Sequence, residues 1–337
     1  MTAKEYFLLE NGNPFFVSEC YSNNRLDSEP SVKKSFVEKL ETLSKVKLTK
    51  DLSELYSIRH DIEKQRLDVS IDIYLTDHCN LNCSGCCTFS PIAPKKFLSL
   101  DNFKNDMKRL SILTQANIYR IVLLGGEPLL NTQCKDFFYW ARYYFPNIHI
   151  ALITNGILLK KQNEDFWKSM SKNSIELIPS LYPIKIDWKS IQEICSKYNI
   201  QFAFASGEDS ETDPTKLKNA EFWFSAKMAH KPIFDINDSF YKCHQRKDCL
   251  SLVDGKLYPC SVASRIHILN EKYGVNYPTD NYIDIYKATS NQELVDFVSS
   301  PVLYVSFVVC LLRNQPNGNY RNEIKMNGFL LIYNFKI

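Results

Sequence analysis

The chain has 337 residues, with 41 Lys and Arg against 38 Asp and Glu, and 11 cysteines. So mild a positive charge, without a dense basic run, gives no reason to expect nucleic-acid binding, and no apolar run approaches the ~20 residues that span a bilayer. The odd number of clustered cysteines favours reduced thiols and metal ligands over disulfides, and no signal-peptide pattern is present, so we expect a cytoplasmic protein.

Residues 1–66 are largely polar, and apolar residues recur at helical spacing within 36–43 and within 52–64. Such spacing is typical of amphipathic helices. The sequence therefore predicts a helical N-terminal extension with a packing or interaction role.

Strand-like and helix-like segments alternate from residue 69 onward. Apolar and polar residues alternate over 69–75, and Ser99 stands in an N-cap position before apolar residues at helical spacing. Further strands are predicted at 121–124, 148–153, 175–180 and 200–205, and further helices at 133–144, 163–171 and 188–198. Because a closed TIM barrel needs eight such repeats, this shorter series predicts an α/β fold with an open, partial (β/α)6 barrel over 67–207.

Polar motifs follow the ends of four predicted strands. They are a cysteine loop after the first, Gly125-Gly126-Glu127-Pro128 after the second, Thr154-Asn155-Gly156 after the third and Ser180 after the fourth. Because ligands bind beyond the carboxyl ends of parallel strands, we expect these motifs to form one site.

The cysteine loop has a C-x3-C-x2-C spacing formed by Cys79, Cys83 and Cys86. Three thiolates from one loop can hold three irons of a [4Fe–4S] cube and leave the fourth iron open to a ligand. Zinc and unligated thiols are the alternatives, although structural zinc usually takes two separated ligand pairs. The adjacent Cys87 is predicted to be a small buried residue.

The cysteine triplet, followed by Gly-Gly-Glu-Pro at the next strand end, resembles the radical SAM enzymes over about residues 70–206. The resemblance implies that the three cysteines hold a [4Fe–4S] cluster and that S-adenosylmethionine (SAM) chelates the open iron. It also implies SAM contacts, to the methionyl amine and to the carboxylate and ribose, from Gly125, Gly126, Glu127, Asn155 and Ser180.

The chemistry implied by the resemblance is a radical reaction. One electron from the reduced cluster would cleave SAM to a 5′-deoxyadenosyl radical, which would abstract hydrogen from an unidentified substrate. An electron donor such as flavodoxin or ferredoxin is an implied partner. Many members carry an adenine-packing aromatic residue where this chain has Gly85, so Phe89 or His78 would take that part.

Beyond the predicted barrel, residues 208–242 are acidic and rich in turn residues, which predicts an irregular connection. Residues 243–337 form a predicted small C-terminal region. It begins with a hairpin, because Asp254-Gly255 stands between two strand-like runs.

A second group of cysteines surrounds this hairpin and is similar to the opening of the SPASM or twitch domains of radical SAM enzymes. The similarity implies an auxiliary [4Fe–4S] cluster held by Cys243, Cys249, Cys260 and Cys310. A zinc site and the absence of any metal are the alternatives for these cysteines.

The sequence thus predicts a radical SAM enzyme that modifies a peptide, a protein or a small molecule. One rival is a non-catalytic binding protein stabilised by zinc or a cluster, which would give no reason for Gly-Gly-Glu-Pro at the second strand end. The other rival is an activase that generates a glycyl radical on a partner protein.

Overall fold

The computed structural model describes residues 67–83, 86–182, 184–205 and 247–307, with short stretches at 6–8, 14–16, 228–229, 232, 236, 239–240, 243 and 329–330. Its strands are β1 (Tyr6–Leu8), β2 (Pro14–Phe16), β3 (Leu67–Tyr74), β4 (Ile118–Leu124), β5 (His149–Thr154), β6 (Ile175–Pro179), β7 (Met228–Ala229), β8 (Leu250–Val253), β9 (Lys256–Tyr258), β10 (Ile283–Asp284) and β11 (Phe329–Leu330). Its helices are α4 (Leu100–Thr114), α5 (Cys134–Tyr144), α6 (Glu164–Lys172), α7 (Trp188–Lys197), α9 (Ser261–Tyr273) and α10 (Asn291–Ser299), with short 3-10 turns η1 (Pro128–Leu130), η2 (Leu159–Lys161) and η5 (Leu303–Phe307).

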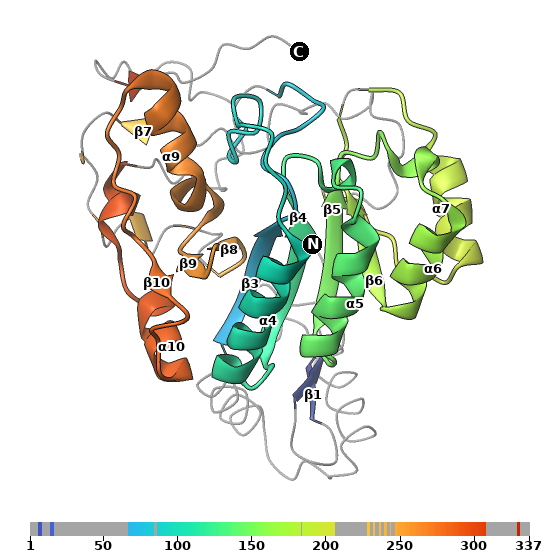
Figure 1. The fold of residues 1–337 in the computed structure, drawn as a ribbon, viewed down its shortest axis with the longest axis horizontal. Coiled ribbons are helices and arrows are strands. Elements are labelled where there is room, and N and C mark those ends of the chain that lie inside the picture. Colours follow the sequence, from blue (N-terminus) through green and yellow to red (C-terminus); the bar gives the residue numbers. More distant parts are fainter. Residues whose placement is uncertain are drawn as a thin grey trace, which may run out of the picture.

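The main sheet has seven strands in the order β10-β9-β8-β3-β4-β5-β6. The strands from β8 to β6 run parallel, and β9 and β10 extend the sheet beside β8 through antiparallel pairs. Figure 1 shows α4 and α5 over one face of the sheet, α6 and α7 beside β6, and α9 and α10 beyond β8. Over the described residues the sheet does not close, which confirms the predicted α/β fold with an open, partial barrel.

The helices predicted within the barrel are present, and polar caps define where most of them begin. Ser99 caps α4, Asn163 caps α6 and Asp187 caps α7, because each side chain accepts a hydrogen bond from a backbone N–H of the first turn. These local signals explain why the sequence places the helices correctly.

One predicted strand is reduced in the structure. Residues 200–205 run beside β6 but make only a single bridge, between Leu177 and Phe202. Among the described residues the neighbouring strand of this segment is β6 alone, so the backbone N–H and C=O groups on its other side lack a strand partner. The helices predicted within 1–66 lie outside the described residues. The two described strands of that region, β1 and β2, form an antiparallel pair.

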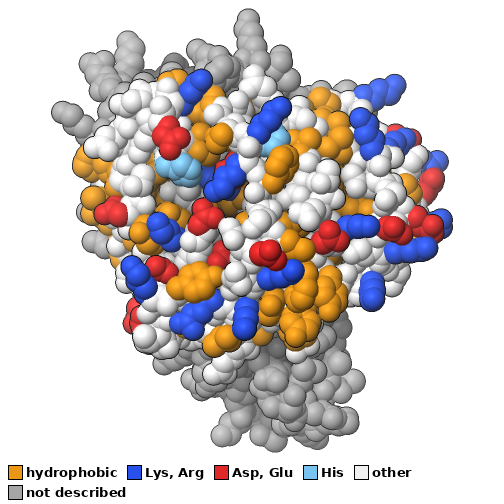
Figure 2. Space-filling view, in the orientation of Figure 1, with side chains coloured by type: hydrophobic (Ala, Val, Ile, Leu, Met, Phe, Trp, Pro, Cys, Tyr) orange, Lys and Arg blue, Asp and Glu red, His pale blue; other side chains and the backbone are white. Residues whose placement is uncertain are grey.

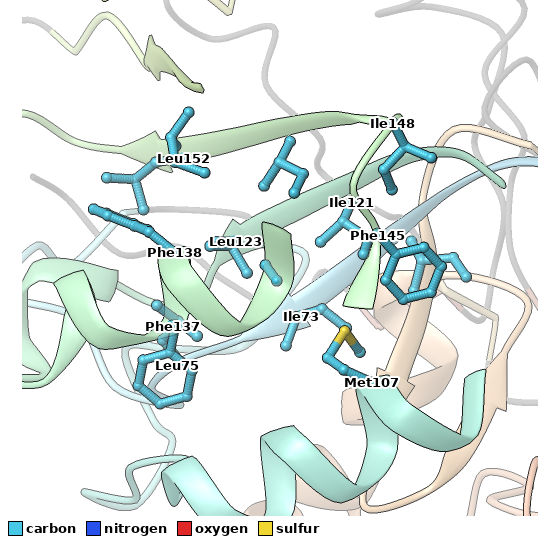
Figure 3. Close-up of a cluster of buried hydrophobic side chains, with 14 of the residues drawn as sticks. Ile73, Leu75, Met107, Ile121, Leu123, Phe137, Phe138, Phe145, Ile148 and Leu152 are labelled. Carbon is cyan, nitrogen blue, oxygen red and sulfur yellow. The ribbon is translucent and has the colours of Figure 1, made fainter. Parts of the chain in front are cut away.

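The main hydrophobic core lies between the sheet and the helices that cover it. Figure 3 shows Ile73 of β3, and Leu75 just after that strand, facing Met107 of α4 and Phe137 and Phe138 of α5. All five side chains are buried. Removing such apolar surface from water supplies about 25 cal/mol per Å², the main favourable term in folding.

The opposite face of β3 is buried as well, although its residues are polar. Ser70, Asp72 and Tyr74 are all less than 9% exposed. Helix α9 covers this face, since Ser261 Oγ donates to Asp72 Oδ2 (3.1 Å) and the Arg265 guanidinium lies 4.0 Å from the centre of the Tyr74 ring. The alternation of apolar and polar residues in 69–75 therefore distinguishes an apolar face of the strand from a polar face, and both faces are buried.

The predicted hairpin is formed by β8 and β9. Its turn residues Asp254 and Gly255 have φ of 48° and 73°, and both central residues of a type I′ turn need a positive φ. Strand β8 also pairs in parallel with β3, with Leu250 beside Ile71. The hairpin at the start of the C-terminal region therefore continues the sheet of the barrel.

We expect the buried carboxyl group of Asp72 to make stability depend on pH. Burial raises its pKa to about 7, against the opposing charge of Arg120 and with a smaller contribution from Asp248. A raised pKa stabilises the fold below the unfolded value near 4, and this contribution is lost as pH rises through 7. The whole loss should be of the order of 4 kcal/mol, of which about 3 kcal/mol falls above pH 5.

The test is the difference in unfolding free energy between wild type and Asp72→Asn, measured by urea denaturation from pH 5 to pH 8. Asparagine can still accept from Ser261 but does not titrate, so the wild type should lose stability relative to the variant as pH rises. Parallel pH profiles for the two proteins would contradict the prediction. Glu127 and Asp106, whose pKa values burial also raises, remain in both proteins.

The surface carries both signs of charge. Figure 2 shows Lys and Arg side chains interspersed with Asp and Glu over this face of the molecule, without a large area of one sign. Such a face lacks the basic footprint of a nucleic-acid-binding protein. In the part of the chain that the structure describes, no helix combines the length and apolar character needed to cross a membrane.

Candidate active site

The cysteine loop leaves the end of β3 and is held against the glycines that follow β4. Gly126 N donates to Thr76 O (3.0 Å), and Glu127 N donates to His78 O (3.1 Å). A Cβ on Gly125 would lie 2.5 Å from Thr76 O, and one on Gly126 would lie 2.1 Å from His78 O. Only glycine permits this approach, because real Cβ atoms never come so close to backbone.

Replacing Gly126 by alanine should therefore displace the cysteine loop. We expect Gly126→Ala to lower the iron content after anaerobic reconstitution and to destabilise the fold by more than the ~1–3 kcal/mol typical of overpacking, since the clash is with backbone. Iron analysis and urea denaturation measure the two effects.

Gly274→Ala is the matched control. Gly274 has a positive φ of 63°, and a Cβ there would meet nothing within 4 Å. It should cost only the ~1 kcal/mol of a left-handed residue and leave the iron content unchanged. Equal iron contents for the two variants would contradict the prediction.

Glu127 braces the ends of β4 and β5. Its side chain is fully buried, and its carboxylate accepts from Leu129 N (3.1 Å), Thr154 Oγ1 (2.7 Å) and Asn155 N (2.8 Å). Burial raises its pKa to about 7, while these three hydrogen bonds oppose the shift. The described contacts of this carboxylate are thus all within the protein, and its predicted contact with SAM stays a prediction.

Asn155 joins the end of β5 to the cysteine loop. Its Nδ2 donates to Asn80 Oδ1 (2.7 Å) and lies 3.6 Å from Cys79 Sγ. The predicted fourth position, Ser180, stands at the end of β6, where its backbone N donates to Thr154 O (2.9 Å). The structure therefore brings the motifs at the ends of β3, β4, β5 and β6 together, as expected from a parallel sheet.

Polar groups lie around the loop sulfurs. Leu81 N donates to Cys79 Sγ (3.4 Å), and Thr88 Oγ1 lies 3.1 Å from Cys86 Sγ. At Cys83, hydrogen bonding from Tyr182 opposes the burial that raises the pKa of this thiol. Donors around sulfur suit ligated thiolates, which accept hydrogen bonds and cannot donate them. The residues present therefore fit a thiolate-bound metal group.

The arrangement of the thiols bears on which metal group fits. Within the described ranges, no three His, Cys, Asp or Glu side chains are grouped closely enough to hold one metal ion. Thiolates on a single zinc lie ~3.8 Å apart at the corners of a tetrahedron with ~2.3 Å bonds. A [4Fe–4S] cube binds its thiolates on separate irons, so it does not need its ligands to share one metal ion.

The thiols of Cys79 and Cys83 are partly shielded from water. Burial raises the pKa of Cys79 to about 12 and also raises the pKa of Cys83. Without a metal these thiols hold their protons at neutral pH, so metal binding must release them.

A buried ion pair joins the start of the cysteine loop to helix α9. Arg265 of α9 lies 2.8 Å from Asp77, and the two side chains are only 3% and 8% exposed. Because Asp77 is two residues before Cys79, the position of α9 is coupled to the position of the loop.

The second cysteine group is partly described. The β8–β9 register pairs Ser251 with Tyr258, so its continuation by two residues sets Cys249 opposite Cys260. Cys260 also caps α9, where its Sγ accepts from Ala263 N (3.5 Å), and Cys243 lies near these thiols. Cys310 lies outside the described residues, as does Gly85.

Cys87 and Phe89 belong to a second, smaller core. The Phe89 ring is 4% exposed within a cluster that includes Ile266 of α9, and the partly buried Cys87 packs against this cluster. Cys87 is thus less buried than predicted, and the Phe89 ring is engaged in packing. His78 is also engaged, since its ring meets Phe97 edge-on and its Nδ1 bonds Thr76 Oγ1 (2.9 Å).

Comparison with known families agrees with this geometry. Residues 73–179 match the family model described as the radical SAM superfamily. This part of the chain belongs to the radical SAM superfamily. A [4Fe–4S] cluster and SAM are the cofactors of this superfamily, which confirms these two predicted cofactors. The SPASM-like region and its second cluster stay predictions.

Two curated relatives of this chain are GTP 3′,8-cyclases. The one from Helicobacter pylori (strain HPAG1) is 31% identical over 111 residues, which is 32% of this chain and 34% of the relative. The one from Nautilia profundicola is 30% identical over 91 residues, which is 27% of this chain and 29% of the relative. The chain thus spans about a third of the length of these relatives.

Solved structures of similar arrangement include BtrN in complex with AdoMet and 2-DOIA and the Streptococcus suis protein SuiB bound to S-adenosylmethionine. BtrN is 18% identical with a TM-score of 0.43, over 70% of this chain and 83% of BtrN. SuiB is 14% identical with a TM-score of 0.40, over 89% of this chain and 88% of SuiB.

Proposed function

We propose that the protein is a radical SAM enzyme that cleaves SAM reductively and abstracts a hydrogen atom from its substrate. One observation carries the proposal. The loop that carries the three cysteines lies against a glycine cradle at the carboxyl ends of parallel strands, and Cys79 and Cys86 have hydrogen-bond partners at sulfur. Three protein thiolates leave one iron of a cube free for SAM.

The residues would divide the work as follows. Cys79, Cys83 and Cys86 would hold the cluster, and the close-packed backbone of Gly125 and Gly126 would receive the methionyl amine. When bound, the cluster and SAM supply the electron and the 5′-deoxyadenosyl radical.

The ends of β5 and β6 would complete the SAM site. Asn155 and Ser180 would contact the carboxylate and ribose, as the resemblance implies. Glu127 would act through its partners Thr154 and Asn155, because its carboxylate is buried against them. Shielding of the loop from water would protect the reactive species from side reactions.

The substrate we propose is a peptide, a protein or a small molecule, and the reductant is a flavodoxin- or ferredoxin-like donor. We also propose an auxiliary [4Fe–4S] cluster at Cys243, Cys249, Cys260 and Cys310. The support for it is that Cys243, Cys249 and Cys260 lie near one another, with Cys260 as the N-cap of α9.

Anaerobic reconstitution tests the proposal. About four or eight irons per chain, with SAM cleaved to 5′-deoxyadenosine on reduction, is the expected result. About one zinc per chain and no cleavage would instead identify a zinc-stabilised binding protein. Tight capture of a large partner chain bearing a glycyl radical would identify an activase.

A further inference from the structure

Two buried hydroxyl groups lie in line with the sulfur of the third loop cysteine. Thr88 Oγ1 is 3.1 Å from Cys86 Sγ and 2.8 Å from Ser90 Oγ. Both hydroxyl-bearing residues are buried, at 8% and 3% exposed. The three side chains therefore form a short hydrogen-bonded path that starts inside the protein and ends at a proposed cluster ligand.

The direction of this path follows from the chemistry of a ligated cysteine. When Cys86 binds iron its sulfur carries no proton, so it can only accept a hydrogen bond. The single proton of the Thr88 hydroxyl is then directed at Cys86, and the Thr88 oxygen accepts from the Ser90 hydroxyl. Because each bond polarises the next in a site sheltered from water, Ser90 strengthens the bond that Thr88 makes to the sulfur.

The residue between the two hydroxyls has a costly backbone conformation. Phe89 has a φ of 54°, in the left-handed region, which costs a residue with a Cβ roughly 1–2 kcal/mol. Its ring is buried in the smaller core, in the cluster that includes Ile266 of α9. Burial of an aromatic ring offsets this cost, so the packing of α9 maintains the bend that carries Thr88 and Ser90.

A hydrogen bond to a ligating thiolate changes the redox balance of a cluster. The reduced cluster carries one more negative charge than the oxidised cluster, so a donor at sulfur stabilises the reduced form more. The reduction potential therefore rises when the bond is present and falls when the bond is removed.

We propose that Thr88, oriented by Ser90, is a positioning residue that raises the reduction potential of the cluster through its hydrogen bond to Cys86. This inference rests on the proposed function, because it needs a cluster held by the loop cysteines. It assigns control of electron uptake to two hydroxyl groups that lie outside the motifs proposed to contact SAM. It also connects that control to α9, whose packing supports Phe89.

The test is a potentiometric titration of the reconstituted holoenzyme, followed by the electron paramagnetic resonance signal of the reduced cluster that responds to added SAM. Thr88→Val keeps the shape of the side chain and removes the hydroxyl. We expect full iron content and a threefold to tenfold shift of the reduction equilibrium toward the oxidised cluster, a potential ~28–59 mV more negative for one electron. Thr88→Ser keeps a hydroxyl and should restore the wild-type potential.

Thr114→Val is the matched control. Thr114 is also a buried threonine, and its hydroxyl donates to Leu110 O (2.8 Å) within α4. Losing this hydroxyl should lower stability and leave the potential unchanged. An equal shift of the potential in Thr114→Val and Thr88→Val would assign the effect to general destabilisation and overturn the inference.

Ser90→Ala decides the matter if Thr88→Val fails to retain iron, since the hydroxyl of Ser90 contacts Thr88. It should lower the potential by less than Thr88→Val does, and it should add nothing when combined with Thr88→Val, because its effect passes through Thr88. A wild-type potential in either variant that retains its cluster would overturn the inference. Loss of iron from Ser90→Ala as well would also overturn it, by showing that the hydroxyls only hold the loop together.

The proposed function is tested separately from this inference. A wild-type protein that binds no cluster and cleaves no SAM would refute the proposed function. A wild-type cluster that cleaves SAM, with a potential that does not respond to Thr88→Val, would refute this inference alone.

Discussion

Replacing Cys79, Cys83 and Cys86 together by alanine is expected to abolish SAM cleavage and to remove about four irons per reconstituted chain. The reason is that their sulfurs are the proposed cluster ligands. In the described part of the loop the one further thiol is that of Cys87, which packs against the smaller core. Iron analysis and chromatography of 5′-deoxyadenosine measure the two losses.

Cys195→Ala is the matched control for this experiment. Cys195 lies on α7 and is 1% exposed within the main core, so its loss should lower stability slightly and leave iron and cleavage unchanged. Undiminished cleavage by the triple variant would refute the assignment of the cluster. Its residual iron also tests the auxiliary cluster, because a triple variant without any iron would leave no place for one.

Arg265→Ala is expected to destabilise the protein by about 3–5 kcal/mol, the cost of leaving a buried charge unpaired. The change leaves the buried Asp77 carboxylate without its partner at 2.8 Å, and it also removes the guanidinium that lies over the Tyr74 ring. Urea denaturation measures the loss. Because Asp77 leads into the cysteine loop, the variant should also bind iron less completely.

Lys96→Ala provides the comparison. Lys96 pairs with Asp254 at 3.3 Å, but both side chains are 55% exposed. An exposed pair contributes only about 0–1 kcal/mol, because water screens it. If the two variants were equally stable, burial of the Arg265–Asp77 pair would have no energetic consequence, and the coupling between α9 and the loop would be wrong.

The fold was predictable where the signal is local. Helix starts followed from caps such as Ser99, and the β8–β9 hairpin followed from Asp254-Gly255, because a short-range backbone requirement selects these residue types. The segment 200–205 was overestimated as a strand. Its apolar pattern is compatible with pairing, but the extent of pairing depends on neighbours that lie far away in the sequence.

The candidate site was predictable in its ligands and less so in their surroundings. The spacing of Cys79, Cys83 and Cys86 is a local feature, and so is the glycine pair beside them. Tyr182 was missed, although its position two residues beyond Ser180, just after a predicted strand end, was a usable signal. A side chain that contacts a loop from another strand end is revealed only when the strands are placed in order.

The sequence by itself determined the cysteine triplet, the Gly125-Gly126 pair and the alternation of strands and helices, because each depends on residues close together in the chain. Tertiary structure decided what covers the polar face of β3, what Glu127 binds and which side chains reach the sulfurs. The alternation of side chains along a strand defines two faces, but only the packing of α9 determines that the face bearing Asp72 is buried. Contacts of that kind join residues far apart in sequence, so their partners follow from the assembled sheet and not from spacing along the chain.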